Sequence, residues 1–293
     1  MAQGIFVGLS TIDVVYRVER FPTPNSKIAA QSQDVLVGGP ATNAAIAFAH
    51  LGGKPTLVTA LGRHALGEVV RRDLNANSVQ LVDLNPEFDD VPAVSSVVVN
   101  GAGERNVVSA NATRIPIPAV EVNTKALEHA RIVLVDGHFM PACQAWAAAA
   151  HARNIPVVLD GGSWKDGTAD LLANVNMAIC SADFLPPGCR DEEETVRYLK
   201  ERGVKHIALT HGGEPVRFES GSSQGTLRVP AVEVVDTMGA GDIFHGTFCY
   251  YTCAGHGFVE ALAEAAQIAS ESCRYHGTRE WMKHRTVDAL PQA

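Results

Sequence analysis

Two glycines and an alanine stand directly before an aspartate in the segment DTMGAGD, residues 236–242. The segment follows a β-forming run at residues 232–235 and precedes an apolar run that predicts a helix from Ile243 to about Cys253. Residues 239–241 then form the turn and the first helical positions, where backbone N–H groups have no partner within the helix. These amides and the helix dipole favour an anion, and small side chains let the backbone approach it. The segment therefore predicts an anion-binding turn.

Asp242 lies in the first turn of this predicted helix, beside the anion site. A carboxylate next to a phosphate repels it and adds nothing to simple binding. Its presence therefore suggests a base that deprotonates a hydroxyl group attacking phosphorus. Alternatively, Asp242 only complements the helix dipole, as acidic residues in first turns often do. The residue types alone leave both interpretations open.

A second glycine pair opens another predicted helix in the segment GGPATN, residues 38–43. Asn43 is the polar residue in the first turns of an alanine-rich helix, so it either binds a ligand or faces solvent beside a tight turn. Asp13 follows the first predicted strand, where an acidic residue either binds hydroxyl groups or forms a turn.

Segments with strand and helix periodicity alternate through most of the chain. We expect short apolar strands at residues 4–9, 56–61, 132–136, 155–160 and 206–210, and helices at 40–51, 66–76, 142–153, 191–202, 243–253 and 257–275. Apolar strands separated by helices are typical of a parallel sheet that is covered on both faces. The expected fold class is α/β.

Two β-rich stretches interrupt this alternation, at residues 14–36 and 93–110. Neither is followed by a crossover helix, and residues 101–103, Gly-Ala-Gly, predict a hairpin tip. We therefore expect a small accessory sheet outside the parallel core, placed so that it can act as a lid. Without an evident linker, residues 1–293 are expected to form one domain with this lid.

The composition excludes several classes of protein. A formal net charge of −8 provides no basic field for nucleic acid, so a nucleic-acid partner is not expected. No apolar run reaches the roughly 20 residues of a membrane span, and the first ten residues read as a strand rather than a signal peptide. The six cysteines form no C-x-x-C pair, which favours reduced thiols and a cytoplasmic protein.

Together, DTMGAGDIFHG and GGPATNAAIAFAHLGG resemble the C-terminal and N-terminal signatures of the ribokinase-like (PfkB) carbohydrate kinase family. The resemblance extends over nearly the whole chain. It implies a ribokinase-like three-layer sandwich with a mostly parallel central sheet, flanking helices and a small β-sheet lid. It also implies an ATP-dependent sugar kinase that uses Mg²⁺ and transfers a phosphoryl group to a hydroxymethyl group of a monosaccharide or sugar derivative.

The resemblance also implies roles for individual residues. Asp242 would be the catalytic base, and Gly239, Ala240 and Gly241 would form the anion hole for the transferred phosphoryl group. Asp13, Gly39 and Asn43 would bind the sugar hydroxyls, with Lys27 and Arg105 of the lid adding contacts to the sugar or phosphate. Thr210 and Gly212 would line the ATP side, Lys165 would face the phosphates, and Asp236 would lie where relatives bind a monovalent cation such as K⁺.

The chain departs from the family pattern in one stretch that bears on magnesium. Many members carry N-x-x-E on the strand before the acidic helix, whereas residues 180–184 here are Cys-Ser-Ala-Asp-Phe. Asp183 or Asp160 could replace the missing glutamate, and the nucleotide phosphates could also hold the metal.

Alternative functions remain open at this point. A nucleoside or vitamin kinase could use the same scaffold, and the missing N-x-x-E also allows a catalytically silent regulatory protein that binds a sugar or nucleotide. The resemblance to this family, whose members commonly dimerise, further implies a homodimer through contact between two lids.

Overall fold

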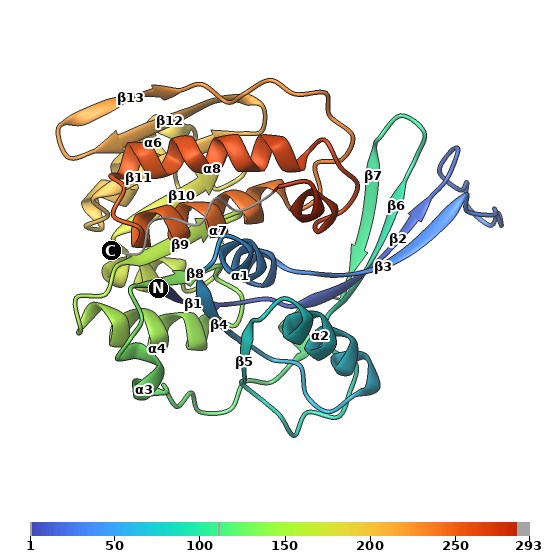
Figure 1. Cartoon of the computed structure of the whole chain (residues 1–293), viewed down its shortest axis with the longest axis horizontal. Helices are drawn as coiled ribbons and strands as arrows, with labels where there is room; N and C mark the ends of the chain where they lie inside the picture. The colour runs from blue at the N-terminus through green and yellow to red at the C-terminus, as the bar shows by residue number, and fades with distance from the viewer. Residues whose placement is uncertain (1, 111, 286–293) are drawn as a thin grey trace.

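A nine-stranded sheet forms the centre of the molecule (Figure 1). The computed structural model describes residues 2–110 and 112–285. The strand order is β13-β12-β11-β10-β9-β8-β1-β4-β5; the strands from β11 to β5 are parallel, while β12 and β13 are antiparallel at one edge. The bounds are β1 Gln3–Val7, β4 Lys54–Thr59, β5 Gln80–Asp83, β8 Ile132–Val135, β9 Val157–Gly161, β10 Met177–Ser181, β11 His206–His211, β12 Glu214–Ser220 and β13 Ser223–Leu227.

Helices cover both faces of this sheet. One face packs against α1 (Pro40–His50), α2 (Ala65–Ala76), α7 (Ala240–Cys253), α8 (Phe258–Ser272) and η3 (Glu280–Lys283). The other packs against α3 (Thr124–Leu127), α4 (Met140–His151), α5 (Thr168–Leu171), η2 (Leu172–Asn174) and α6 (Glu192–Glu201); a short η1 spans Ala112–Arg114. The three-layer α/β prediction is confirmed.

The strands divide their side chains between the two helical layers. Phe6 of β1 lies in the core beneath α1 and α7, whereas its neighbours Ile5 and Val7 lie in the core beneath α4. All three are at most 1% exposed. Because successive side chains of a strand point to opposite faces, a strand buried on both faces reads as a continuous apolar run. This is the physical reason why the strand predictions succeeded.

A smaller four-stranded sheet projects from the body, with the order β3-β2-β6-β7 (Figure 1). Its strands are β2 Thr11–Arg17, β3 Ser32–Gly38, β6 Val94–Val99 and β7 Arg105–Ser109. Both predicted β-rich stretches contribute to it, although β2 and β3 together span residues 11–38 rather than 14–36. The sheet extends further because Thr11 and Ile12 pair with Gly38 and Val37.

Within the described ranges, no helix combines the length and apolar character that crossing a membrane requires.

Candidate active site

Most of the predicted site residues lie at the carboxyl edge of the central sheet or on the lid beside it. Strands β1, β8, β9, β10 and β11 end at this edge, so the loops that follow them begin there. Helices α1 and α7 also begin there. Asp136 and Asp160 lie at or just after the ends of β8 and β9. In an open α/β sheet this edge is the usual place for a ligand.

Helix α7 begins as the DTMGAGD motif predicted. Gly239 precedes the helix with a φ of 71°, and a Cβ at this position would lie 2.7 Å from Thr278 Cγ2. The Ala240 amide closes the turn to Thr237 O at 3.3 Å. Within the described chain, the amides of Gly239, Gly241 and Asp242 donate to no atom, and a Cβ on Gly241 would meet nothing within 4 Å. The turn therefore presents free N–H groups to open space, as anion binding requires.

Asp242 is held by Asn43, the polar residue of the other glycine-rich segment. Asn43 Nδ2 donates to Asp242 Oδ2 at 2.7 Å, and Asn43 is 4% exposed. Burial and the nearby Asp160 carboxylate raise the pKa of Asp242 to about 7, against the opposing effects of the Asn43 hydrogen bond and His245. A carboxyl group with this pKa is suited to accept a proton near neutral pH.

Arg279 fixes the orientation of Asn43, and the sequence analysis missed it. Its Nη1 donates to Asn43 Oδ1 at 2.8 Å, so the amide nitrogen of Asn43 is the atom that faces Asp242. Its Nη2 donates to Val37 O at 3.1 Å and to Asp73 Oδ2 at 3.3 Å. A single arginine after the last long helix gives no periodic signal, which explains why only the fold reveals this role.

The start of α1 is built by close approach of the backbone. Gly39 has a φ of 101°, and a Cβ there would lie 2.2 Å from Leu9 O. Asp136 accepts the N–H groups of Ala41 at 3.2 Å and Leu9 at 2.8 Å. Asp136 was not singled out from the sequence, although an acid at the end of an apolar strand was an available signal.

Asp13 lies in β2, on the face of the lid that also carries Ser95 of β6. A Cβ on Gly38 would lie 2.1 Å from Asp13 Oδ2, so only glycine fits beside this carboxylate. Burial raises the pKa of Asp13, against hydrogen bonds from Ser95 and Thr11. The structure thus brings Asp13 next to the glycine pair that opens α1.

Two arginines of the lid reach the anion-binding turn. Arg105 Nη2 donates to Thr237 Oγ1 at 3.2 Å, and Arg17 Nη2 lies 3.5 Å from Asp236 Oδ2. The Asp236 carboxylate also accepts the N–H groups of Met238 at 2.9 Å and Gly277 at 3.0 Å. Lys27, by contrast, is exposed in the loop between β2 and β3, with no partner among the described residues.

A cavity of 480 Å³ opens beside the turn and contains the two residues predicted for the nucleotide. Thr210 and Gly212 line it together with Ala240 and Gly241 of the anion-binding turn. The rest of the wall is mainly apolar and comes from residues 229–234, α7 and α8. A largely apolar cavity with a few polar groups at one end is typical of a small-molecule site.

Lys165 follows β9 but does not line this cavity. Its Nζ donates to Ser163 O at 3.2 Å, and a Cβ on Gly137 would lie 3.2 Å from its Cδ. Asp160, at the end of β9, is 6% exposed and lies 3.5 Å from His245 of α7. His245 also lines the cavity, and sequence reasoning missed it.

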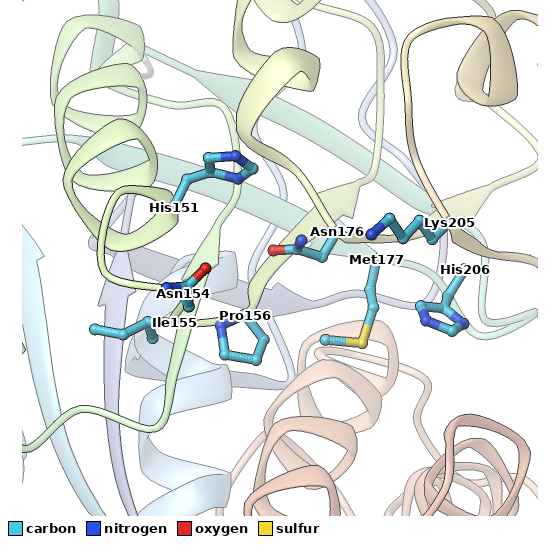
Figure 2. A pocket seen from close by; sticks show the side chains of 8 residues that line it. All are labelled: His151, Asn154, Ile155, Pro156, Asn176, Met177, Lys205 and His206. Carbon is cyan, nitrogen blue, oxygen red and sulfur yellow. The ribbon is translucent and has the colours of Figure 1, made fainter.

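A second hollow, of 510 Å³, lies at the opposite edge of the sheet (Figure 2). Its lining residues, among them Pro156, Met177 and His206, precede or begin strands β9, β10 and β11. None of the predicted site residues lines it. The chemistry-bearing residues therefore select the cavity beside α7 as the candidate active site.

Comparison with known proteins identifies the family of the chain. Residues 1–285 match the model of the family described as pfkB family carbohydrate kinase. The ribokinase of Bacillus subtilis is 25% identical over 284 residues, covering 95% of each chain.

Two solved structures share the fold. A candidate ribokinase from Agrobacterium tumefaciens has a TM-score of 0.85 at 23% identity, covering 97% of this chain and 98% of that one. Arabidopsis thaliana ribokinase complexed with ribose and ATP has a TM-score of 0.80 at 22% identity, covering 96% and 97%. The chain belongs to the pfkB family of carbohydrate kinases, which are phosphotransferases with an alcohol group as acceptor.

Proposed function

We propose that this protein is an ATP-dependent sugar kinase that transfers the γ-phosphoryl group of ATP to a hydroxymethyl group of a monosaccharide or sugar derivative. One observation carries the proposal: Asp242, whose carboxylate accepts a hydrogen bond from Asn43, belongs to the same first turn of α7 as the free amides of residues 239, 241 and 242. A base and an anion hole within one helical turn are the two elements that phosphoryl transfer to an alcohol requires.

The proposed reaction follows from these positions. Asp242, as the carboxylate, accepts the proton of the sugar hydroxyl while that oxygen attacks the γ-phosphorus; the bond from this phosphorus to the β,γ-bridging oxygen breaks, and ADP leaves with the electron pair. The free amides of the turn donate to the equatorial oxygens of the transferred group, where negative charge has to be stabilised. Asn43 holds the carboxylate in place at 2.7 Å. The lid, held to the turn through Arg17 and Arg105, excludes water that would otherwise compete as acceptor.

ATP is proposed to occupy the cavity beside α7. Its largely apolar lining, which includes Phe244 and Ala269, suits a purine base, and Thr210 and Gly212 also line the cavity. The phosphates would then extend toward Gly241, whose open side leaves room for them. Lys165 is proposed to approach the phosphates by leaving its contact with Ser163.

The sugar is proposed to bind between the lid and α1. Asp13, Gly39 and Asn43 border this region, and Arg105 reaches it from β7. Lys27 would join only if the loop between β2 and β3 folds inward. The sugar of Arabidopsis ribokinase is ribose, and at 22% identity the same sugar is one member of the class to be tested.

Magnesium would supply positive charge to the phosphates when bound. No group of three or more His, Cys, Asp or Glu side chains in the described part of the chain could hold a metal. This donor set fits a metal that is bound mainly by the nucleotide phosphates, with few protein ligands. Asp183, exposed just after β10, is the carboxylate that we propose to reach it.

A monovalent cation beside Asp236 remains a prediction. The Asp236 carboxylate already accepts two backbone N–H groups and faces Arg17, which supplies a positive charge. A cation such as K⁺ would therefore depend on carbonyl oxygens nearby.

A homodimer through the lids is proposed from the surface of the small sheet. Val35, Val14, Ser96 and Val108 form a row across its four strands, on the face opposite Asp13, and Val35 and Val108 are 55% and 76% exposed. Strands β3 and β7 are the edges of this sheet. Exposed valines and sheet edges are features that a partner sheet would cover.

We propose a cytoplasmic location for this protein. All six cysteines are free thiols, which the reducing cytoplasm favours, and the cytoplasm also supplies ATP.

The test is ATP consumption by the purified protein, with sugars, sugar phosphates and nucleosides offered separately and the Asp242→Asn variant as the blank. Formation of ADP and a phosphorylated sugar only with the unmodified protein is the expected result. Phosphorylation of nucleosides instead would identify the alternative kinase class. Sugar or ATP binding without turnover in any mixture would favour a regulatory protein.

A further inference from the structure

His245 is a buried imidazole on α7, one helical turn beyond the anion-binding turn. Its Nδ1 lies 2.7 Å from Gly241 O and its Nε2 lies 3.1 Å from Ile179 O in β10. The residue is 7% exposed. Both ring nitrogens therefore face backbone oxygens that can only accept hydrogen bonds.

The two contacts bear on how many N–H groups the ring carries. A neutral imidazole carries one N–H, so its other nitrogen would point a lone pair at a carbonyl oxygen. Only the imidazolium, with two N–H groups, satisfies both contacts. A cation in this position needs a nearby negative charge, because burial of an unpaired charge is unfavourable.

Asp160 is the carboxylate that faces this ring; burial raises its pKa, whereas His245 lowers it. Its Oδ2 lies 3.5 Å from His245 Nδ1, is buried and has no hydrogen-bond partner in the described chain. The carboxylate extends from the end of β9, so the pair joins the sheet to the first turn of α7. Gly241, which receives the other contact of Nδ1, belongs to the anion-binding turn itself.

We propose that His245 and Asp160 form a buried imidazolium–carboxylate pair that positions the first turn of α7 and balances the negative charge around Asp242. The proposal rests on the proposed function in one respect, the role of Asp242 as base. His245 and Asp160 are positioning residues in this scheme, since neither accepts the proton of the sugar.

Four charged or titratable side chains from different parts of the described chain surround Asp242 and its partner Asn43. Asp160 and Asp136 approach from β9 and β8, His245 belongs to α7, and Arg279 lies behind Asn43. Asp136 is kept ionised by His138 and three backbone N–H groups, which outweigh burial and lower its pKa. Asp160 and Asp136 raise the pKa of Asp242, whereas His245 lowers it.

The two members of the pair should therefore shift Asp242 in opposite directions. Replacing the cation in His245→Gln should raise the pKa of Asp242, because a stabilising charge is lost. Replacing the anion in Asp160→Asn should lower it. The signs differ because an opposite charge lowers the pKa of a carboxyl group, whereas a like charge raises it. A purely structural role for the pair would not produce shifts of opposite sign.

The experiment is a titration of the Asp242 side-chain carboxyl carbon by nuclear magnetic resonance in the full chain, without substrate. It is carried out on the unmodified protein, His245→Gln, Asp160→Asn and a matched control, His206→Gln. His206 is half-buried and its Nδ1 lies 2.7 Å from Ser220 Oγ, but it lies at the opposite edge of the sheet. Opposite shifts in the two variants and none in the control are expected. Equal or absent shifts would overturn the proposal.

A second measurement does not depend on any variant folding. Nitrogen resonances of His245 in the unmodified protein distinguish an imidazolium, with two protonated nitrogens, from a neutral ring with one bare nitrogen. Two protonated nitrogens at pH 7 are expected, and one bare nitrogen would refute the pair. Both readouts work without turnover, so failure of the kinase assay and failure of this proposal are separate results. If the protein is active, the acidic limb of the pH profile of kcat/KM should move to higher pH in His245→Gln and to lower pH in Asp160→Asn.

Discussion

Asn43 at the start of α1 donates to Asp242 at the start of α7, 199 residues later, at 2.7 Å. The contact joins the two glycine-rich segments of the chain, and Arg279 determines which atom of the amide faces the carboxylate. Helix N-termini commonly attract anions separately. Here two of them meet at one carboxylate, which makes Asp242 part of a constructed site rather than a simple complement to a helix dipole.

Asn43→Ala should impair catalysis through Asp242. The hydrogen bond that is lost stabilised the ionised carboxylate and lowered the pKa of Asp242, so this pKa should rise from its value of about 7. We expect kcat/KM at pH 7 to fall by roughly tenfold to a hundredfold, and its acidic limb to move to higher pH. The pH dependence of kcat/KM measures both effects. Asn123→Ala, which removes an exposed amide that caps α3, is the control and should leave the kinetics unchanged; an unchanged profile in Asn43→Ala would contradict the assigned contact.

Asp242→Asn should stabilise the fold at alkaline pH. The pKa of Asp242 is about 7 in the folded protein, against 3.8 as the ordinary value. Between these values the folded state binds more protons than the unfolded state, so this group makes stability fall as pH rises from about 4 to 7. Removing the charge should raise the free energy of unfolding at pH 8 by roughly 1–2 kcal/mol, with the difference vanishing near pH 4. Urea unfolding at both pH values gives the comparison; lower stability of the variant at pH 8 would mean that the buried charge is compensated.

Gly241→Ala should separate folding from turnover. A Cβ at Gly241 meets nothing within 4 Å, and the residue lies inside α7, where alanine favours the helix by up to about 1 kcal/mol. The added methyl would occupy the space that we propose for the phosphoryl group. We therefore expect an unchanged or higher melting temperature together with a loss of turnover of at least about a hundredfold. Full activity in a normally folded variant would place the phosphoryl group elsewhere.

Ala269→Leu should weaken the binding of ATP. Ala269 of α8 lines the cavity beside α7 and is 9% exposed, so the larger side chain would extend into the space proposed for the base. We expect KM for ATP to rise by roughly tenfold while KM for the sugar stays within about twofold, since the loss is in nucleotide binding. Steady-state kinetics with each substrate varied in turn tests this. A rise in the sugar KM alone would reverse the assignment of the two sides.

Val108→Glu should disrupt the proposed dimer. The residue is 76% exposed on β7, and a charge at this position would have to be buried between two lids. Sedimentation velocity over a range of concentrations should show a dimer for the unmodified protein and a monomer for the variant. Val91→Glu is the matched control, because Val91 is 47% exposed but lies outside the lid strands. A monomer before any substitution would remove the proposal.

The sequence predicted those parts of the fold that depend on local pattern. Strands buried on both faces are continuous apolar runs, and the strand predicted at 132–136 is β8, Ile132–Val135, which ends one residue earlier. Glycines with positive φ are equally local: Gly239 must precede α7 because its backbone angle excludes other side chains. The role of Asp242 could be suggested in the same way, from free amides in a first helical turn.

Contacts between distant segments could not be read from pattern. No sequence periodicity relates Arg279 to Asn43 or His245 to Asp160. The fold nevertheless brings the first pair within hydrogen-bond distance and the second within ion-pair distance. The sequence by itself determined where each strand and helix forms and which turn could hold an anion, because these follow from side-chain spacing. Only the tertiary structure decided which charges surround the carboxylate, because charge interactions depend on distance in space and on exclusion of water.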